Sequence, residues 1–265
     1  AVETPAALDA HLLQTVARLE NPAISAFIPT NASVFFIEAD WHGKKRLLGV
    51  TVAHAQDIMY DNLYIFLRLP SGEEKHFPVK FITSGTMGRA DVALLDVPTN
   101  AAPYIQPLKL ATQPPAVGEK LRSYGFFHGD FRIVPNRTVR ETTPGRVITS
   151  FEFGNLARAG ACGGPLINKQ NEVVGVHCGS SVHKQESYAI PVGLLTDLLE
   201  SAQRGEIKTY DLVLSGRAIG TIRLDEYIAA VVTTNNGKPA GKRLLWHDEK
   251  AVDYQHLETL LPLDN

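Results

Sequence analysis

Three side chains that together could carry out nucleophilic chemistry stand at His54, Asp91 and Cys162. Cys162 lies in the turn sequence GACGGP, between glycines. Glycines on both sides of a nucleophile let the backbone bend so that its amide hydrogens converge beside the thiol, which is how an oxyanion hole is built. A lone cysteine in a glycine-rich turn is also a common small buried hydrophobe, so the turn alone does not decide its role.

His54 and Asp91 both stand at the ends of strand-like apolar runs. His54 ends the run VTVAH, and Asp91 opens the run DVALLDV. The chain order His, Asp, Cys is the order base, orienter, nucleophile of one known triad solution. A thiol needs only a modest lowering of its pKa to become a strong nucleophile, so Cys162 beside His54 would form a thiolate–imidazolium pair. Asp91 would fix the tautomer of His54, or else be an ordinary carboxylate at a strand end.

Together these motifs resemble those of the trypsin-like (chymotrypsin-fold) peptidases, with cysteine in place of the usual serine. In that family the histidine lies in a TAAH-type motif, the aspartate in a D-I-A-L-type motif and the nucleophile in G-x-S-G-G-P; the matching stretches here are TVAHA, DVALL and GACGGP. SYAIPV at residues 187–192 resembles the HtrA-type bacterial peptidases. GACGG followed by GVH at residues 175–177 resembles the picornavirus-type cysteine proteases. The resemblance covers roughly residues 25 to 203.

The resemblance also implies roles for residues around the nucleophile. The backbone amides of Gly160 and Cys162 are the expected oxyanion hole. His177 and Gly179 are the expected substrate-binding residues, with His177 reading a glutamine or glutamate side chain; the alternative for His177 is a core histidine satisfied by backbone groups. The viral enzymes carry a hydroxyl residue five positions before the nucleophile, where this chain has Ala157.

Composition narrows the range of partners. The 265 residues are 44% hydrophobic, 20% charged and carry a formal net charge of −2, which is typical of a globular protein with a real core. No basic run exceeds KKR, so nucleic acid is not an expected partner, and no apolar segment is long enough to cross a membrane. No zinc-like ligand spacing occurs, so we expect neither a metal nor another cofactor, and a polypeptide substrate as the partner. The oligomeric state is not indicated.

The two cysteines, Cys162 and Cys178, are too few for a disulfide framework, and a bond between them would block the nucleophile. If Ala1 is a processed terminus, we expect a secreted or periplasmic protein, and otherwise a cytoplasmic one.

The chain is expected to be mostly β, a double β-barrel of chymotrypsin type with an N-terminal helix and a small C-terminal α/β extension. The predicted division is residues 1–24 as an N-terminal helical segment, 25–100 as the first barrel, 101–203 as the second barrel with a closing helix, and 204–265 as the extension. The N-terminal helix is predicted from apolar residues at helical spacing: Leu8, Leu12, Leu13, Val16 and Leu19.

Strands are predicted from short apolar runs between turn signals. In the first barrel these are VFFI, RLLGVTV, LYIFLRL, the pair within KHFPVKFI, and VALLDV. In the second they are KLRSYG, RIVPN, GRVITS, PLIN, EVVGVH and SYAI, followed by the helix VGLLTDLLESAQ. In the extension we expect a β-hairpin about Ser215 and Gly216, the strand IAAVVTT and a helix over residues 248–261.

The leading hypothesis is a cysteine endopeptidase that works through a Cys-His-Asp triad and an acyl-enzyme, with glutamine or glutamate preferred on the acyl side of the cut bond. One alternative is a catalytically silent protease-fold module that binds peptides or a partner. Another is a serine peptidase whose nucleophile has been replaced by cysteine.

Overall fold

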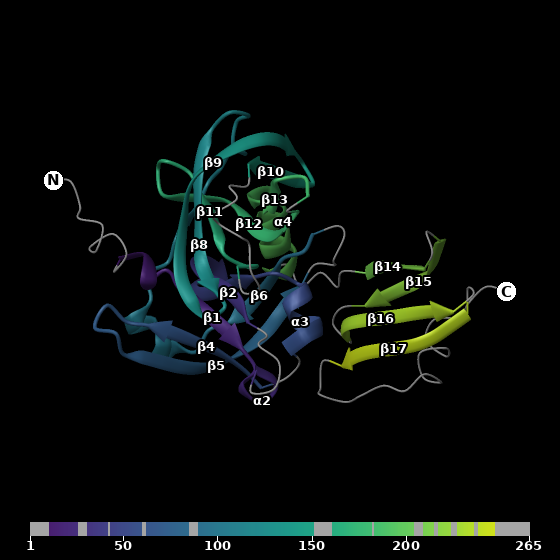
Figure 1. Cartoon of the computed structure of the whole chain (residues 1–265). Helices are drawn as coiled ribbons and strands as arrows, with labels where there is room; N and C mark the ends of the chain where they lie inside the picture. The colour runs from purple at the N-terminus through teal and green to yellow at the C-terminus, as the bar shows by residue number, and fades with distance from the viewer. Residues whose placement is uncertain are drawn as a thin grey trace. The chain divides into compact units, whose positions relative to one another are not determined.

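The computed structural model describes residues 11–25, 31–41, 43–59, 62–84, 90–150, 161–181, 183–203, 209–214, 217–223, 227–235 and 238–246 (Figure 1). The chain divides into two compact units, Ala1–Leu199 and Glu200–Asn265. The first unit holds all the residues to which the sequence assigns chemistry.

Six antiparallel strands form a closed barrel in the first half of unit 1, in the order β1-β2-β3-β6-β5-β4. Their bounds are β1 Val16–Glu20, β2 Ala32–Trp41, β3 Lys44–Thr51, β4 Leu63–Arg68, β5 Glu74–Ser84 and β6 Ala93–Asp96. Two short helices, α2 Pro22–Ser25 and α3 His54–Met59, follow β1 and β3. Closure gives every strand a neighbouring strand on both sides, so none of the six is an edge strand.

The prediction of a helix continuing through Val16 and Leu19 is wrong. Between residues 11 and 21 only residues 11–13 are helical; residues 14 and 15 form a turn, and Val16–Glu20 form β1. Val16 pairs with Phe35 of β2, and Leu19 pairs with Ile65 of β4. These apolar residues are buried by strand packing instead of by a helix face. Strand β1 is covered on both faces, and its backbone bonds to β2 on one side and to β4 on the other.

The predicted pair of strands within KHFPVKFI is also wrong, because this segment is the single strand β5. Proline cannot donate a ladder hydrogen bond, yet Pro78 lies within this strand. In the structure Pro78 stands opposite Tyr64 of β4, and from Lys80 onward β5 pairs with β6 instead. The single strand β5 therefore pairs with β4 through its first part and with β6 through its last part. The sixth strand of the barrel is β1.

A second set of strands follows in unit 1, above the first barrel in Figure 1. Its elements are η1 Thr99–Tyr104, β7 Lys109–Leu110, β8 Lys120–Phe127, β9 Asp130–Thr143, β10 Arg146–Ser150, β11 Pro165–Ile167, β12 Glu172–Ser181, β13 Glu186–Pro191 and α4 Val192–Gln203. The sheet order is β11-β8-β9-β10-β13-β12-β7, and β11 also pairs with β12, which closes a ring of six strands. The mostly β, double-barrel fold predicted from the sequence is confirmed, as is the closing helix α4.

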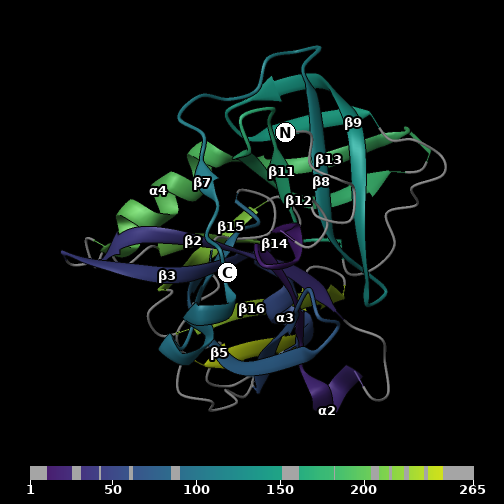
Figure 2. The ribbon, with the colours of Figure 1, turned by 90° about the vertical axis from the view of Figure 1, so that its left-hand side faces the viewer.

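The two barrels meet where β8 contacts β1 and β2. In both views the second set of strands lies above the first barrel (Figure 1, Figure 2). The backbone N–H of Phe126 donates to Ser33 Oγ at 2.8 Å, and the Tyr124 hydroxyl lies 2.9 Å from Thr15 Oγ1. Apolar side chains fill the second barrel, among them Leu121, Val139, Val147, Leu166, Val174 and Ala189. The buried junction gives the barrels fixed positions, which any site built from both of them requires.

Unit 2 contains two antiparallel pairs of strands. They are β14 Thr209–Leu214 with β15 Arg217–Arg223, and β16 Tyr227–Asn235 with β17 Lys238–Trp246. The predicted hairpin and the strand IAAVVTT are confirmed, and β17 was not predicted. The helix predicted over residues 248–261 lies outside the described residues.

Candidate active site

Asp91 holds His54 through two contacts. Oδ1 of Asp91 accepts a hydrogen bond from the backbone N–H of His54 at 2.9 Å, and Oδ2 lies 2.6 Å from Nδ1 of the ring. Both residues stand at ends of neighbouring barrel strands, since His54 opens α3 just after β3, and Asp91 comes just before β6. With Nδ1 facing Asp91, the second ring nitrogen is left for another partner.

Cys162 stands in a tight turn that is hydrogen-bonded to both barrels. Its carbonyl accepts from the N–H of Ser33 in β2 at 2.8 Å, and the N–H of Gly163 donates to the His177 carbonyl at 2.7 Å. Gly163 has φ +90°, and a Cβ there would lie 2.0 Å from the Ser33 carbonyl oxygen. Only glycine fits this position, because the turn needs both a left-handed backbone and close approach to β2.

The thiol and the imidazole are brought together across the junction of the barrels. Burial works against a charged His54, but hydrogen bonds to Asp91 and Cys162 outweigh it and raise the pKa of His54 to about 10. The ring is therefore an imidazolium at neutral pH. The Cys162 Sγ also lies 3.5 Å from the Cys178 carbonyl oxygen, and both cysteines are free thiols.

His177 and Gly179 lie on β12, beside the turn of Cys162. His177 is 3% exposed, and its Nε2 has no hydrogen-bond partner in the described part of the chain. Burial, aided by the charges of Arg137 and His54, lowers the pKa of His177 to about 3, so the ring is neutral. Gly179 follows a bulge in β12 and has open space where a side chain would stand. Of the other predicted positions, Gly160 and Ala157 lie outside the described residues.

Comparison with known proteins identifies the family of the chain. Residues 27–176, more than half of the chain, match the family model described as the trypsin-like peptidase domain. The chain belongs to the trypsin-like peptidases. Its substrates are therefore polypeptides. No curated protein sequence is similar enough to the chain to count as a match.

Two solved structures share the fold of this trypsin-like peptidase. The serine endoprotease from Yersinia pestis matches with a TM-score of 0.58 and 19% identity, over 81% of this chain and 73% of that one. The active form of the Rv3671c protease from M. tuberculosis matches with a TM-score of 0.54 and 19% identity, over 81% of this chain and 88% of that one. At this level of identity the likeness shows the fold alone.

Sequence reasoning missed two residues of the peptidase that the tertiary structure brings to the site. Ser33 is fully buried, and it contacts the Cys162 turn through its backbone and β8 through its side chain. Arg137, on β9, is 3% exposed, although an arginine in a polar stretch is normally assigned to the surface. No local sequence signal marks this burial; in the structure the preceding Asn136 has a positive φ of 57°.

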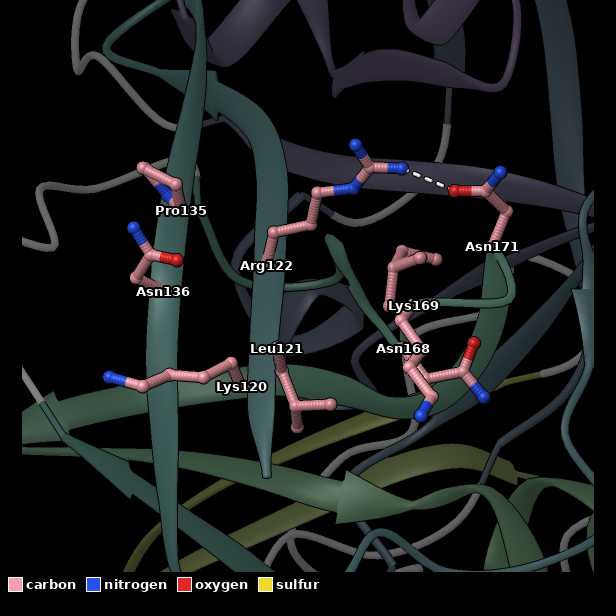
Figure 3. A pocket seen from close by; sticks show the side chains of 9 residues that line it. Lys120, Leu121, Arg122, Pro135, Asn136, Asn168, Lys169 and Asn171 are labelled. Carbon is pink, nitrogen blue, oxygen red and sulfur yellow. Dashed lines mark hydrogen bonds between the residues drawn. The ribbon is translucent and has the colours of Figure 1, made fainter. Parts of the chain in front are cut away.

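A separate pocket of about 230 Å³ lies on the second barrel, between β8, β9 and the turn that joins β11 to β12 (Figure 3). Arg122 donates to the Asn171 side chain across it. The remaining lining residues are Lys120, Leu121, Pro135, Asn136, Ile167, Asn168 and Lys169. None of the residues predicted for chemistry lines this pocket, so it is not part of the candidate active site.

The described residues contain no group of three or more His, Cys, Asp or Glu side chains that could hold a metal ion. Among the described helices, none has both the length and the apolar character that crossing a membrane requires.

Proposed function

We propose that this trypsin-like peptidase is a cysteine endopeptidase whose nucleophile is Cys162, with His54 as its acid and base and Asp91 as the orienter of His54. One observation carries the proposal: His54 is anchored twice by Asp91, contacts Cys162, and has a pKa raised to about 10 by these partners against the effect of burial. An imidazolium beside a thiol favours the thiolate, and the thiolate is the reactive form of cysteine. A structural cysteine needs no such partner.

The proposed reaction begins when the Cys162 thiolate attacks the carbonyl carbon of the scissile bond, whose oxygen becomes an oxyanion. The backbone amides of Gly160 and Cys162 are the proposed donors to that oxyanion. The His54 imidazolium gives its proton to the leaving amine as the carbon–nitrogen bond breaks, which leaves a thioester on Cys162. Neutral His54 then takes a proton from water, the hydroxide oxygen attacks the thioester, and the carbon–sulfur bond breaks to restore the thiolate and the imidazolium.

His177 and Gly179 are the proposed substrate-binding residues, and glutamine or glutamate is the proposed side chain on the acyl side of the cut bond. His177 is neutral and has an unpartnered Nε2, which can donate a hydrogen bond in the tautomer that carries its proton there. A site that must hydrogen-bond a polar side chain discriminates strongly, since an apolar substrate would leave the buried group unpaired. The open space beside Gly179 leaves room for substrate backbone.

The test is alkylation by a limiting dose of iodoacetamide at neutral pH, with mass spectrometry to compare the two cysteines. We expect Cys162 to react on the order of 100-fold faster than Cys178, because burial, with the charges of Asp91 and Cys162, raises the pKa of Cys178 to about 12. In parallel, Cys162→Ala should abolish hydrolysis of a fluorogenic peptide library, and Cys178→Ala is the matched control. Equal labelling of the two thiols would contradict the proposed nucleophile.

Two alternatives remain as outcomes of the same experiment. The relative from Yersinia pestis is a serine endoprotease, which favours testing Cys162→Ser. If that variant turns over peptides faster than the native chain, the protein is a serine peptidase whose nucleophile has been replaced. If neither form hydrolyses any peptide and Cys162 shows no enhanced alkylation, the silent peptide-binding module is the better account.

A further inference from the structure

Three buried polar side chains in the second barrel have side-chain atoms with no hydrogen-bond partner in the described part of the chain. They are Ser123 of β8, at Oγ, Arg137 of β9, at Nε and Nη1, and His177 of β12, at Nε2. Each residue is 3% exposed. Buried polar atoms in native proteins are nearly always paired, so three unpaired groups in one barrel need an explanation.

Strand register places all three side chains on the inward face of the barrel. Residues directly opposite each other on paired strands share one face of a sheet. Arg137 stands opposite Leu121, Ser123 opposite Leu166, and His177 opposite Ala189. These three opposite residues all belong to the apolar core inside the barrel.

The group lies next to the proposed nucleophile. The N–H of Gly163 donates to the His177 carbonyl at 2.7 Å, and the N–H of His177 donates to the Gly164 carbonyl at 2.8 Å. The next residue on β12, Cys178, has its carbonyl oxygen 3.5 Å from the Cys162 Sγ. These contacts place the backbone of His177 directly against the Cys162 turn.

Arg137 brings a positive charge into this interior. Burial lowers its pKa to about 10, so the guanidinium stays charged at neutral pH. The positive charge of Arg137 disfavours a second positive charge on His177 and so helps to lower the pKa of His177. Nε and Nη1 of Arg137 have no hydrogen-bond partner in the described part of the chain. A buried charge left unpaired is costly, and an anion in contact with it would offset that cost, while a neutral amide would do so far less.

We propose that Arg137 is a specificity-determining residue whose charge makes the substrate site beside Cys162 select an ionised carboxylate side chain, so that glutamate is preferred to glutamine on the acyl side of the cut bond. This inference rests on the proposed function and narrows its substrate class. His177 supplies a hydrogen bond that both side chains can accept, whereas Arg137 supplies the charge that distinguishes them.

The experiment compares kcat/KM for two fluorogenic peptides that differ only in glutamate or glutamine at that position. In the wild type we expect a preference for glutamate on the order of 10- to 100-fold. Arg137→Met should abolish the preference, and Arg137→Lys should retain most of it because the charge remains. Arg140→Met, an exposed arginine of the same strand, is the matched control and should keep the wild-type ratio.

Binding gives a readout that does not depend on turnover. Isothermal calorimetry with Cys162→Ala compares two acetylated tetrapeptides that end in glutamate or glutamine, and the glutamate peptide should bind more tightly by a similar factor. A wild-type ratio at or below one overturns the inference, and this result needs no variant to fold. If Arg137→Met folds and keeps the wild-type ratio of glutamate to glutamine, the inference is overturned as well, because the preference then does not depend on the charge of Arg137.

The two proposals fail in different ways. Absence of hydrolysis for both peptides, together with equal alkylation of the two cysteines, rejects the cysteine endopeptidase. The calorimetric comparison on Cys162→Ala still decides whether Arg137 selects a carboxylate. Efficient hydrolysis with a preference for glutamine rejects the proposed role of Arg137 and leaves the cysteine endopeptidase proposal standing.

Discussion

His54 and His177 both contact the Cys162 turn, and their pKa values move in opposite directions. His54, at the edge of the first barrel, has a pKa raised to about 10 because its bonds to Asp91 and Cys162 outweigh burial. His177, inside the second barrel, has a pKa lowered to about 3 because burial and the charges of Arg137 and His54 act together. One imidazole is charged at neutral pH and the other is neutral.

The difference shows how each histidine is supported. His54 has its partners within the protein, and such a pre-arranged group can act on a substrate without reorganising. Nε2 of His177 has no hydrogen-bond partner in the described part of the chain. The same is true of Nε and Nη1 of Arg137, which lies in the same barrel. Groups left unpaired in a native interior are suited to contact a ligand, because a ligand can offset the cost of their burial.

The largest effect should follow from removing the charged histidine. His54→Ala should slow alkylation of Cys162 by iodoacetamide at neutral pH by on the order of 100-fold, because the thiolate loses its cationic partner. The rate is measured by mass spectrometry of the modified peptide. His183→Ala, which removes an exposed histidine, is the control and should leave the rate unchanged. A similar rate in His54→Ala would mean that the two histidines do not differ in the proposed way.

The Cys162 turn, which both histidines contact, offers a second test. Gly163→Ala should lower the free energy of unfolding by about 2–4 kcal/mol, since the new Cβ meets the Ser33 carbonyl oxygen at 2.0 Å and φ is +90°. Gly129→Ala also has a positive φ, of +86°, but meets open space, so about 1 kcal/mol is expected. Urea denaturation of the two variants measures both values. Equal losses would show that β2 does not confine the Cys162 turn.

The pH dependence of stability should have opposite signs for the two histidines. The folded-state pKa of His54 is raised, so its contribution is complete below about pH 6.5 and is lost as pH rises toward about 10. The folded-state pKa of His177 is lowered, so its contribution is present above about pH 6.5 and is lost as pH falls toward about 3. Each loss is expected to reach about 2 kcal/mol over two pH units.

This last prediction is measured by urea denaturation at pH 5, 7 and 9. Relative to His54→Gln, the wild type should lose stability between pH 7 and 9. Relative to His177→Gln, it should lose stability between pH 7 and 5. If both losses of stability occurred on the same side of pH 7, the contrast between the two environments would be wrong.

Much of the fold was predictable because its signals are local. The strands of the second barrel alternate with turn residues, and the helix Val192–Gln203 has an apolar face that the sequence displays directly. Where the predictions failed, a local pattern fitted two structures. Val16 and Leu19 have helical spacing, but β2 and β4 bury them as a strand.

By itself, the sequence determined that His54, Asp91 and Cys162 form the candidate chemistry, because their order and flanking motifs are visible along the chain. The tertiary structure alone decided that Ser33 supports the Cys162 turn and that Arg137 lies inside the second barrel. Nothing local distinguishes a buried arginine from an exposed one. Whether it faces the core depends on strand register, and register is set by the neighbouring strands that close the barrel.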